Sequence, residues 1–209
     1  DSPFLVELTK DGDSYKAGQL LRANRLNQYK DMENGDWQFL MWDEEENRTK
    51  VPKGSVGNRW AKENKGHWNL KLEDNADGSK IHPKLTFLKD SDHVFSVELD
   101  DFGQGETITR YVPVKMIETA DGQVPVATVY DLLMAQYGVG RGLEGYPENY
   151  EEDATYTPAW AEKYTGIAPE TLIRFAREWA STAEKTGGKC TVIIGAGINH
   201  WYHANLMYR

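Results

Sequence analysis

The sequence predicts an α/β fold in which an irregular, mostly β region precedes helices and one strand of the parallel type. Residues 1–125 hold short apolar runs separated by turn residues, which is typical of short strands. After Val126 the pattern changes to helical periodicity with capping signals. Near the end, the continuous apolar run CTVIIG at 190–195 is typical of a strand that is buried on both faces. We therefore expect two parts, 1–125 and 126–209, of which the second is a partial α/β domain.

The first part contains five candidate strands, at residues 4–8, 38–42, 69–72, 93–99 and 107–115. The stretch FSVELD at 95–100 alternates apolar and polar residues, as a half-buried strand does. Pairs such as Asn34-Gly35 and Asp121-Gly122 mark turns between the runs. The acidic run at 43–46 predicts a solvated loop. This part is expected to lie at the surface of the protein.

Three helices are expected in the second part, at 128–138, 157–166 and 169–188. Thr128 and Thr157 stand where N-caps are needed, and glycines end each pattern. In the third helix, apolar residues recur at three- and four-residue spacing, so that they share one face. We expect Trp160, Phe175 and Trp179 to anchor a core.

A glycine turn follows the candidate strand at 190–195. Gly195 and Gly197 would let the backbone bend and approach a ligand closely, because no Cβ intervenes. A helix that starts there offers unpaired N–H groups, which suit an anion such as phosphate. The alternative is that glycine serves the geometry of the turn alone. The motif is incomplete as a dinucleotide fingerprint, since His200 stands where a third glycine would be.

Polar side chains beside the turn are the candidate binding residues. Asn199 and His200 follow the glycines, and His203 lies three positions further on. An amide and an imidazole can both donate hydrogen bonds to an anion or a heteroaromatic ring. We expect no metal ligands here, because no Glu or Cys stands at ligand spacing. Arg174 and Arg177 either bind phosphate or pair with neighbouring glutamates, and the glycine-rich stretch 137–145 either approaches a ligand or is a plain surface loop.

Composition excludes several classes of function. The formal charge of −9 argues against nonspecific nucleic-acid binding. Cys190, the single cysteine, excludes an intramolecular disulfide and a four-cysteine cluster built from these 209 residues. No apolar run approaches the roughly 20 residues of a membrane span. Because the sequence starts without Met at Asp1 and stops at Arg209 within a helical pattern, we expect a piece of a longer protein.

Several motifs resemble the alpha subunit of respiratory, membrane-bound nitrate reductase, a member of the molybdopterin oxidoreductase family. They are YTPAWAEKYTGIAPETLIRFAREWA and GGKCTVIIGAGINHWYHANLMYR in the second part, with TVYDLLMAQYGVGRGL before them. In the first part, SPFLVEL, YKAGQLLRA, PKGSVGNRWA and HWNLKLE agree. The resemblance covers nearly the whole chain and implies that 126–209 belongs to a Rossmann-like cofactor domain.

The resemblance also implies cofactors and partners. Members of the family hold molybdenum on bis-molybdopterin guanine dinucleotide and carry a 4Fe–4S cluster near the N-terminus of the subunit. They reduce nitrate to nitrite with electrons from quinol, passed through a membrane gamma subunit and an iron–sulfur beta subunit at the cytoplasmic face of the membrane. Nothing here matches the cluster-binding segment or the aspartate that ligates molybdenum. The isolated piece is therefore expected to hold no cofactor and to be inactive.

In the family, the matching strand, turn and helix face the dinucleotide cofactor. Carried over to this sequence, the cofactor-facing residues are Gly195, Gly197, Asn199, His200 and His203. His200 is the candidate catalytic residue, through positioning or proton transfer. Two other functions stay open: a nucleotide-binding domain of the NAD type, and a non-catalytic region that docks another subunit.

Overall fold

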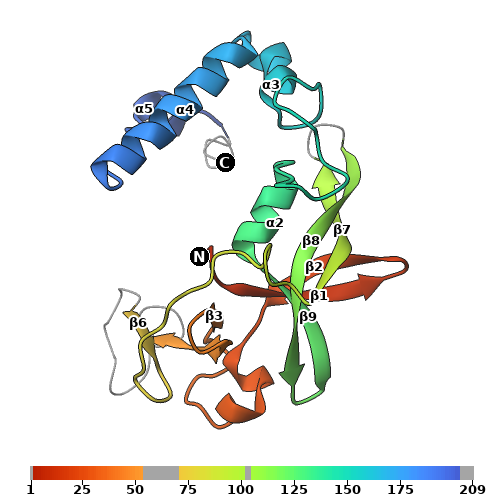
Figure 1. Ribbon diagram of the computed structural model, residues 1–209, viewed down its shortest axis with the longest axis vertical. Coiled ribbons are helices and arrows are strands. Elements are labelled where there is room, and N and C mark those ends of the chain that lie inside the picture. The colour runs from red at the N-terminus through yellow and green to blue at the C-terminus, as the bar shows by residue number, and fades with distance from the viewer. Residues whose placement is uncertain (1, 54–70, 102–104, 203–209) are drawn as a thin grey trace.

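A closed barrel of five strands forms the centre of the computed structural model, which describes residues 2–53, 71–101 and 105–202 (Figure 1). In barrel order the strands are β1 (Leu5–Asp11), β2 (Ser14–Leu20), β7 (His93–Asp101), β8 (Glu106–Thr119) and β9 (Gly122–Thr128). The pairs are antiparallel except β2 with β7, which run parallel. With helices toward the C-terminal end, the mixed sheet confirms the α/β class.

Two long hairpin ladders explain why the barrel closes. β7 and β8 pair from His93 opposite Val114 to Asp101 opposite Glu106. β8 then turns at the predicted Asp121-Gly122 pair and continues into β9, where Gly122 has a φ of 113°. This left-handed conformation strains residues other than glycine. β9 pairs on its other edge with β1, which leaves no open edge in the sheet.

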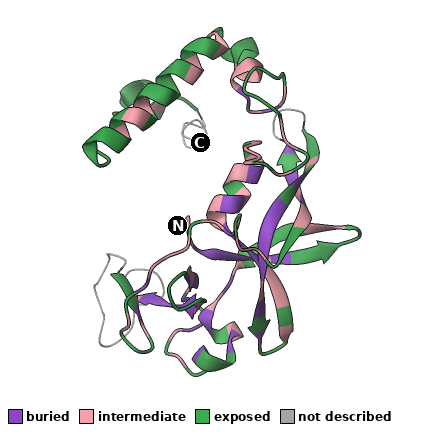
Figure 2. Ribbon diagram, in the orientation of Figure 1, coloured by how far each residue is buried: buried purple, intermediate pink, exposed green. Residues whose placement is uncertain are grey.

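The core has two buried clusters, and both include residues of the barrel strands. The first cluster holds Leu8, Val97, Leu99, Val112, Val114, Ala127 and Ala135. The second cluster joins the barrel to the short 3-10 helices Ala23–Arg25 and Asn27–Tyr29, and includes Leu5, Leu21, Leu40, Val51 and Phe87. Burial is concentrated in these regions of the molecule (Figure 2).

Two small sheets extend the second cluster, and they correct one expectation. β3 (Met41–Asp43) pairs with β4 (Arg48–Lys50), and β5 (Pro52–Lys53) pairs with β6 (Lys71–Asp74). The acidic run at 43–46 is therefore not wholly solvated: Asp43 is fully buried, with its Oδ2 2.6 Å from the Nζ of buried Lys50. The β3–β4 hairpin brings the two together, which the acidic run alone does not indicate.

α2 (Val129–Gln136) begins at the predicted N-cap and is fastened to the barrel region by one carboxylate. The Thr128 hydroxyl accepts a hydrogen bond of 3.0 Å from the Asp131 amide. The buried Asp131 side chain accepts from the Phe87 amide at 2.9 Å and pairs with Arg141 Nη1 at 2.9 Å. Asp131 thus joins α2 to the loop that holds Arg141 and to the segment at Phe87, 44 residues earlier in the sequence.

α3 (Pro158–Thr165) and α4 (Pro169–Thr186) follow their predicted limits closely. Thr157 caps α3, and Gly166 and Gly187 end the two helices in the left-handed conformation. The two helices pack on each other and lie apart from the barrel (Figure 1). Neither has a buried residue, so the expectation that Trp160, Phe175 and Trp179 anchor a core is wrong here. Phe175 is 59% exposed because no described element covers this face of α4.

The expected strand at 190–195 does not form. These residues have no strand partner among the described residues, and Val192, Ile193 and Ile194 are exposed. A parallel strand requires a neighbour to accept and donate its backbone hydrogen bonds. The parallel pairing present in the described chain is instead that of β2 with β7. No described helix is both long and apolar enough to cross a bilayer.

Candidate functional site

The candidate site is the turn that starts at Gly195 and leads into the short helix α5 (Ala196–Asn199). Gly195 is the N-cap, with an extended backbone at φ −108° and ψ −170°. The turn is closed by backbone hydrogen bonds: the Ile198 amide donates to the Gly195 carbonyl, and the His200 amide donates to the Ala196 carbonyl, both at 3.3 Å. A helix start therefore follows the glycine, as the sequence indicates, but it follows an exposed segment and no strand.

The two glycines are not required by the backbone conformation of this turn. Neither Gly195 nor Gly197 is among the residues with positive φ. A Cβ on either would meet no other atom within 4 Å. The space beside both residues is open, so a ligand can approach the bare backbone from that side.

The structure brings four of the five predicted residues onto this one turn. Gly195, Gly197 and the backbone of Asn199 lie within it, and His200 follows as the C-cap of α5 with its side chain exposed. His203 lies outside the described residues. An exposed imidazole beside open peptide groups can donate a hydrogen bond to an anion or to a ring nitrogen.

The turn is open on the side of its two glycines and is not enclosed by other described residues. The open sides of Gly195 and Gly197 suit the close approach of a diphosphate, but no other described residue closes over them. Cys190 does not contribute a ligand group: its thiol donates weakly to the Trp179 carbonyl, 3.9 Å away. Within the described ranges, no three His, Cys, Asp or Glu side chains gather as a metal site would require.

A second feature, which the sequence does not indicate, is a cavity of about 730 Å³ beside the glycine-rich loop. Its walls include three tyrosines and two arginines: Tyr137, Tyr150, Tyr156, Arg141 and Arg177. We name it the arginine–tyrosine cavity. From the sequence alone, the 137–145 loop either approaches a ligand or is a plain surface loop, and Arg177 either binds phosphate or pairs with neighbouring glutamates. Only the fold shows that they meet, because α4 returns past the loop.

The comparison with known proteins finds similarity along the whole chain. The chain is 35% identical over 212 residues to the nitrate reductase alpha chain of Bacillus subtilis and 38% identical over 224 residues to the respiratory nitrate reductase 1 alpha chain of Escherichia coli. The alpha subunit of Mycobacterium tuberculosis is 38% identical over 216 residues. Each match covers 100% of this chain. Over its whole length, the chain is similar to a segment of these nitrate reductase alpha chains.

The nitrate reductase alpha chains are much longer than this chain. It spans 17% of the Bacillus subtilis chain and 18% of the Escherichia coli chain. No protein-family model matches the chain. The resemblance drawn from the motifs is confirmed, and the relation is that of a segment to a larger subunit.

Proposed function

We propose that this chain is part of the catalytic alpha subunit of a molybdenum-dependent respiratory nitrate reductase, which reduces nitrate to nitrite. The observation that carries the proposal is similarity along the whole chain to alpha chains from three distant bacteria. In the assembled enzyme, electrons from quinol would arrive through a membrane gamma subunit and an iron–sulfur beta subunit, at the cytoplasmic face of the membrane. A 4Fe–4S cluster would lie elsewhere in the alpha subunit.

Within that subunit, the turn at 195–200 supplies one wall of the bis-molybdopterin guanine dinucleotide site. Two observations support this role. Gly195 and Gly197 adopt backbone conformations that other residue types can also adopt, so the geometry of the turn does not explain why both positions hold glycine. Their open sides and the exposed His200 are available together to one ligand.

The bound molybdenum cofactor would supply the oxygen-atom transfer, and this chain would position its surroundings. The backbone of Gly195 to Asn199 would hold part of the dinucleotide. The His200 imidazole would donate a hydrogen bond toward the cofactor or nitrate, and proton delivery is its second role. His203, carried over from the family motif, would flank the same wall.

The division into 1–125 and 126–209 remains a proposal. β9 crosses this boundary, whereas the helices and the turn lie beyond it. Beyond α2, the second part exposes several large apolar side chains: Phe175, Val192, Ile193, Ile194 and Trp201. The remainder of the alpha chain is the proposed cover, and it would add the strand neighbours that residues 190–195 lack.

The isolated 209-residue chain is expected to bind no molybdenum and to reduce no nitrate, because it holds one wall of the site. Metal analysis of the purified chain, with a nitrate assay driven by a reduced viologen, measures both properties. The full alpha subunit, prepared the same way, is the positive control. Stoichiometric molybdenum on the isolated chain would contradict the one-wall assignment.

A further inference from the structure

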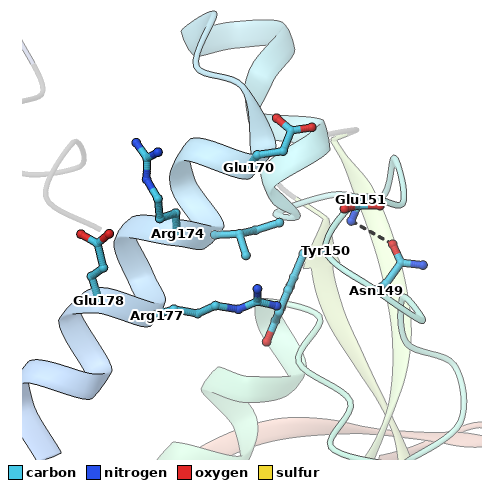
Figure 3. Close-up of a pocket in the computed structure, with 8 residues that line it drawn as sticks. Asn149, Tyr150, Glu151, Glu170, Arg174, Arg177 and Glu178 are labelled. Atoms are coloured by element: carbon cyan, nitrogen blue, oxygen red, sulfur yellow. Dashed lines mark hydrogen bonds between the residues drawn. The ribbon is translucent and has the colours of Figure 1, made fainter.

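The arginine–tyrosine cavity is a second place where the chain gathers groups suited to a ligand, and neither Gly195 nor His200 lines it. It lies between the loop after α2, the start of α3 and the middle of α4. Asn149, Tyr150 and Arg177 also line a neighbouring cavity of about 550 Å³. Figure 3 shows this neighbouring cavity: Arg177 reaches from α4 toward Tyr150, and Arg174 on the same helix lines this neighbouring cavity but not the arginine–tyrosine cavity.

Positive charge converges on the arginine–tyrosine cavity in a chain whose net charge is −9. Its lining residues include two cations, Arg141 and Arg177, and one acidic residue, Glu148. Arg141 is paired through Nη1 with Asp131, but its Nε and Nη2 have no hydrogen-bond partner among the described residues. The positive charge of the two guanidinium groups favours a bound anion in this cavity.

A third arginine stands behind the cavity wall. Arg110, on β8, is 8% exposed, and its Nε has no hydrogen-bond partner among the described residues. Its Nη1 donates to the Gly145 carbonyl, and its guanidinium lies over the ring of Tyr146. Burial lowers the pKa of Arg110. Its Nη2 would lie 3.8 Å from a Cβ on Gly138, beside the Pro147 ring, and both Gly138 and Pro147 line the cavity.

The backbone of the cavity wall is strained at two positions. Arg141 has a φ of 53° and Tyr156 a φ of 74°. Bulky side chains rarely adopt positive φ, whereas asparagine tolerates it, and the other two such residues in the described chain are Asn34 and Asn47. Strain of this kind clusters at binding and catalytic sites.

The ring faces in the wall indicate the rest of the ligand. Tyr137 and Tyr150 are 42% and 55% exposed, so both rings are accessible. Tyr137 and Tyr156 pack edge to face with centroids 5.7 Å apart. The volume suits a molecule of nucleotide size rather than a simple oxyanion.

We propose that the arginine–tyrosine cavity binds a phosphorylated planar heterocycle of nucleoside monophosphate size. Arg177 would hold the phosphate from the open side, with Arg141 and Arg110 contributing positive potential from behind. The tyrosine rings would stack on the heterocycle. This site is separate from the turn at 195–200 and does not depend on the nitrate reductase assignment.

Isothermal titration of the 209-residue chain with adenosine 5′-monophosphate tests the proposal. We expect saturable binding of one molecule per chain, with a dissociation constant below about 1 mM. Arg177→Ala should raise the dissociation constant about tenfold, because a charge-assisted pair to the phosphate is lost. Adenosine and inorganic phosphate, titrated separately, should each bind at least about tenfold more weakly than the nucleotide.

Arg174→Ala is the matched control, since it removes the same charge from the same helix, at a residue that lines the neighbouring cavity but not the arginine–tyrosine cavity. It should change the dissociation constant by less than about twofold. Melting curves followed by circular dichroism serve to check that each variant folds like the parent chain. Absence of saturable binding up to about 10 mM would overturn the proposal. So would an equal loss in Arg174→Ala and Arg177→Ala, or inorganic phosphate binding as tightly as the nucleotide.

Discussion

Replacing Lys50 with Met is expected to destabilise the chain by about 3–5 kcal/mol, because it leaves the buried Asp43 carboxylate without its cationic partner. Lys50 and Asp43 are both fully buried, with Nζ 2.6 Å from Asp43 Oδ2. Lys50 also contacts Glu46 at 2.6 Å and donates to the Lys80 carbonyl at 2.8 Å. Urea denaturation followed by circular dichroism measures the change in the free energy of unfolding.

The pH dependence of this effect has a definite sign. Burial alone would raise the pKa of Asp43, but the hydrogen bonds from Lys50 and from the Glu46 and Glu45 amides outweigh it, so the pKa is lowered. A carboxyl with a lowered pKa stabilises the fold above its ordinary pKa and loses that contribution as pH falls through the lowered value. The difference between the parent chain and Lys50→Met should therefore shrink in acid.

Two controls separate the charge from the side chain. Lys53→Met removes a more exposed lysine, 3.8 Å from Glu73, and should cost no more than about 1 kcal/mol. The double variant Asp43→Leu with Lys50→Met removes both charges and should recover much of the lost stability. If Lys50→Met unfolds at the same urea concentration as the parent chain, the buried pair does not hold this hairpin.

In the assembled alpha subunit, His200→Ala is expected to lower nitrate turnover by about 100-fold while the molybdenum content stays unchanged. The proposed reason is the loss of a hydrogen-bond donor beside the cofactor wall. Steady-state nitrate reduction with a reduced viologen, together with metal analysis, measures both quantities.

His93→Ala is the matched control for this prediction. His93 is exposed on β7, in the barrel, and its ring stacks on Phe95 at 5.4 Å. Its loss should leave turnover unchanged. His200→Gln keeps a donor but cannot exchange a proton near neutral pH, so recovery of activity by this variant favours positioning over proton transfer. Unchanged turnover in His200→Ala would remove His200 from the site.

The helices were predictable because their signals are local. Thr128, Thr157, Gly166 and Gly187 act where the sequence places them, since capping depends on residues within one turn. Strands that carry alternating patterns, such as β7, were also found. β2 was missed: four of its seven residues are exposed, none is buried, and it exists by pairing with β1 and with β7, whose partner residues are 82 positions away.

The site was predictable only in part, for a related reason. The turn at 195–200 forms from local hydrogen bonds, whereas the expected strand before it needs neighbours that the described residues do not supply. The buried Asp43–Lys50 pair and the arginine–tyrosine cavity both join residues from separate segments. Their charges looked like surface charges in the sequence, because burial depends on which segments meet.

The most direct measurement for the central claim is a structure of the complete alpha subunit that contains this segment, with its cofactor bound. The distance to determine joins the backbone amides of Gly195–Asn199 to the nearest cofactor atom. We expect at least one amide within hydrogen-bond reach, about 3 Å, and the His200 side chain facing the same ligand. If packed side chains separate the turn from the cofactor, this segment does not form a wall of the site.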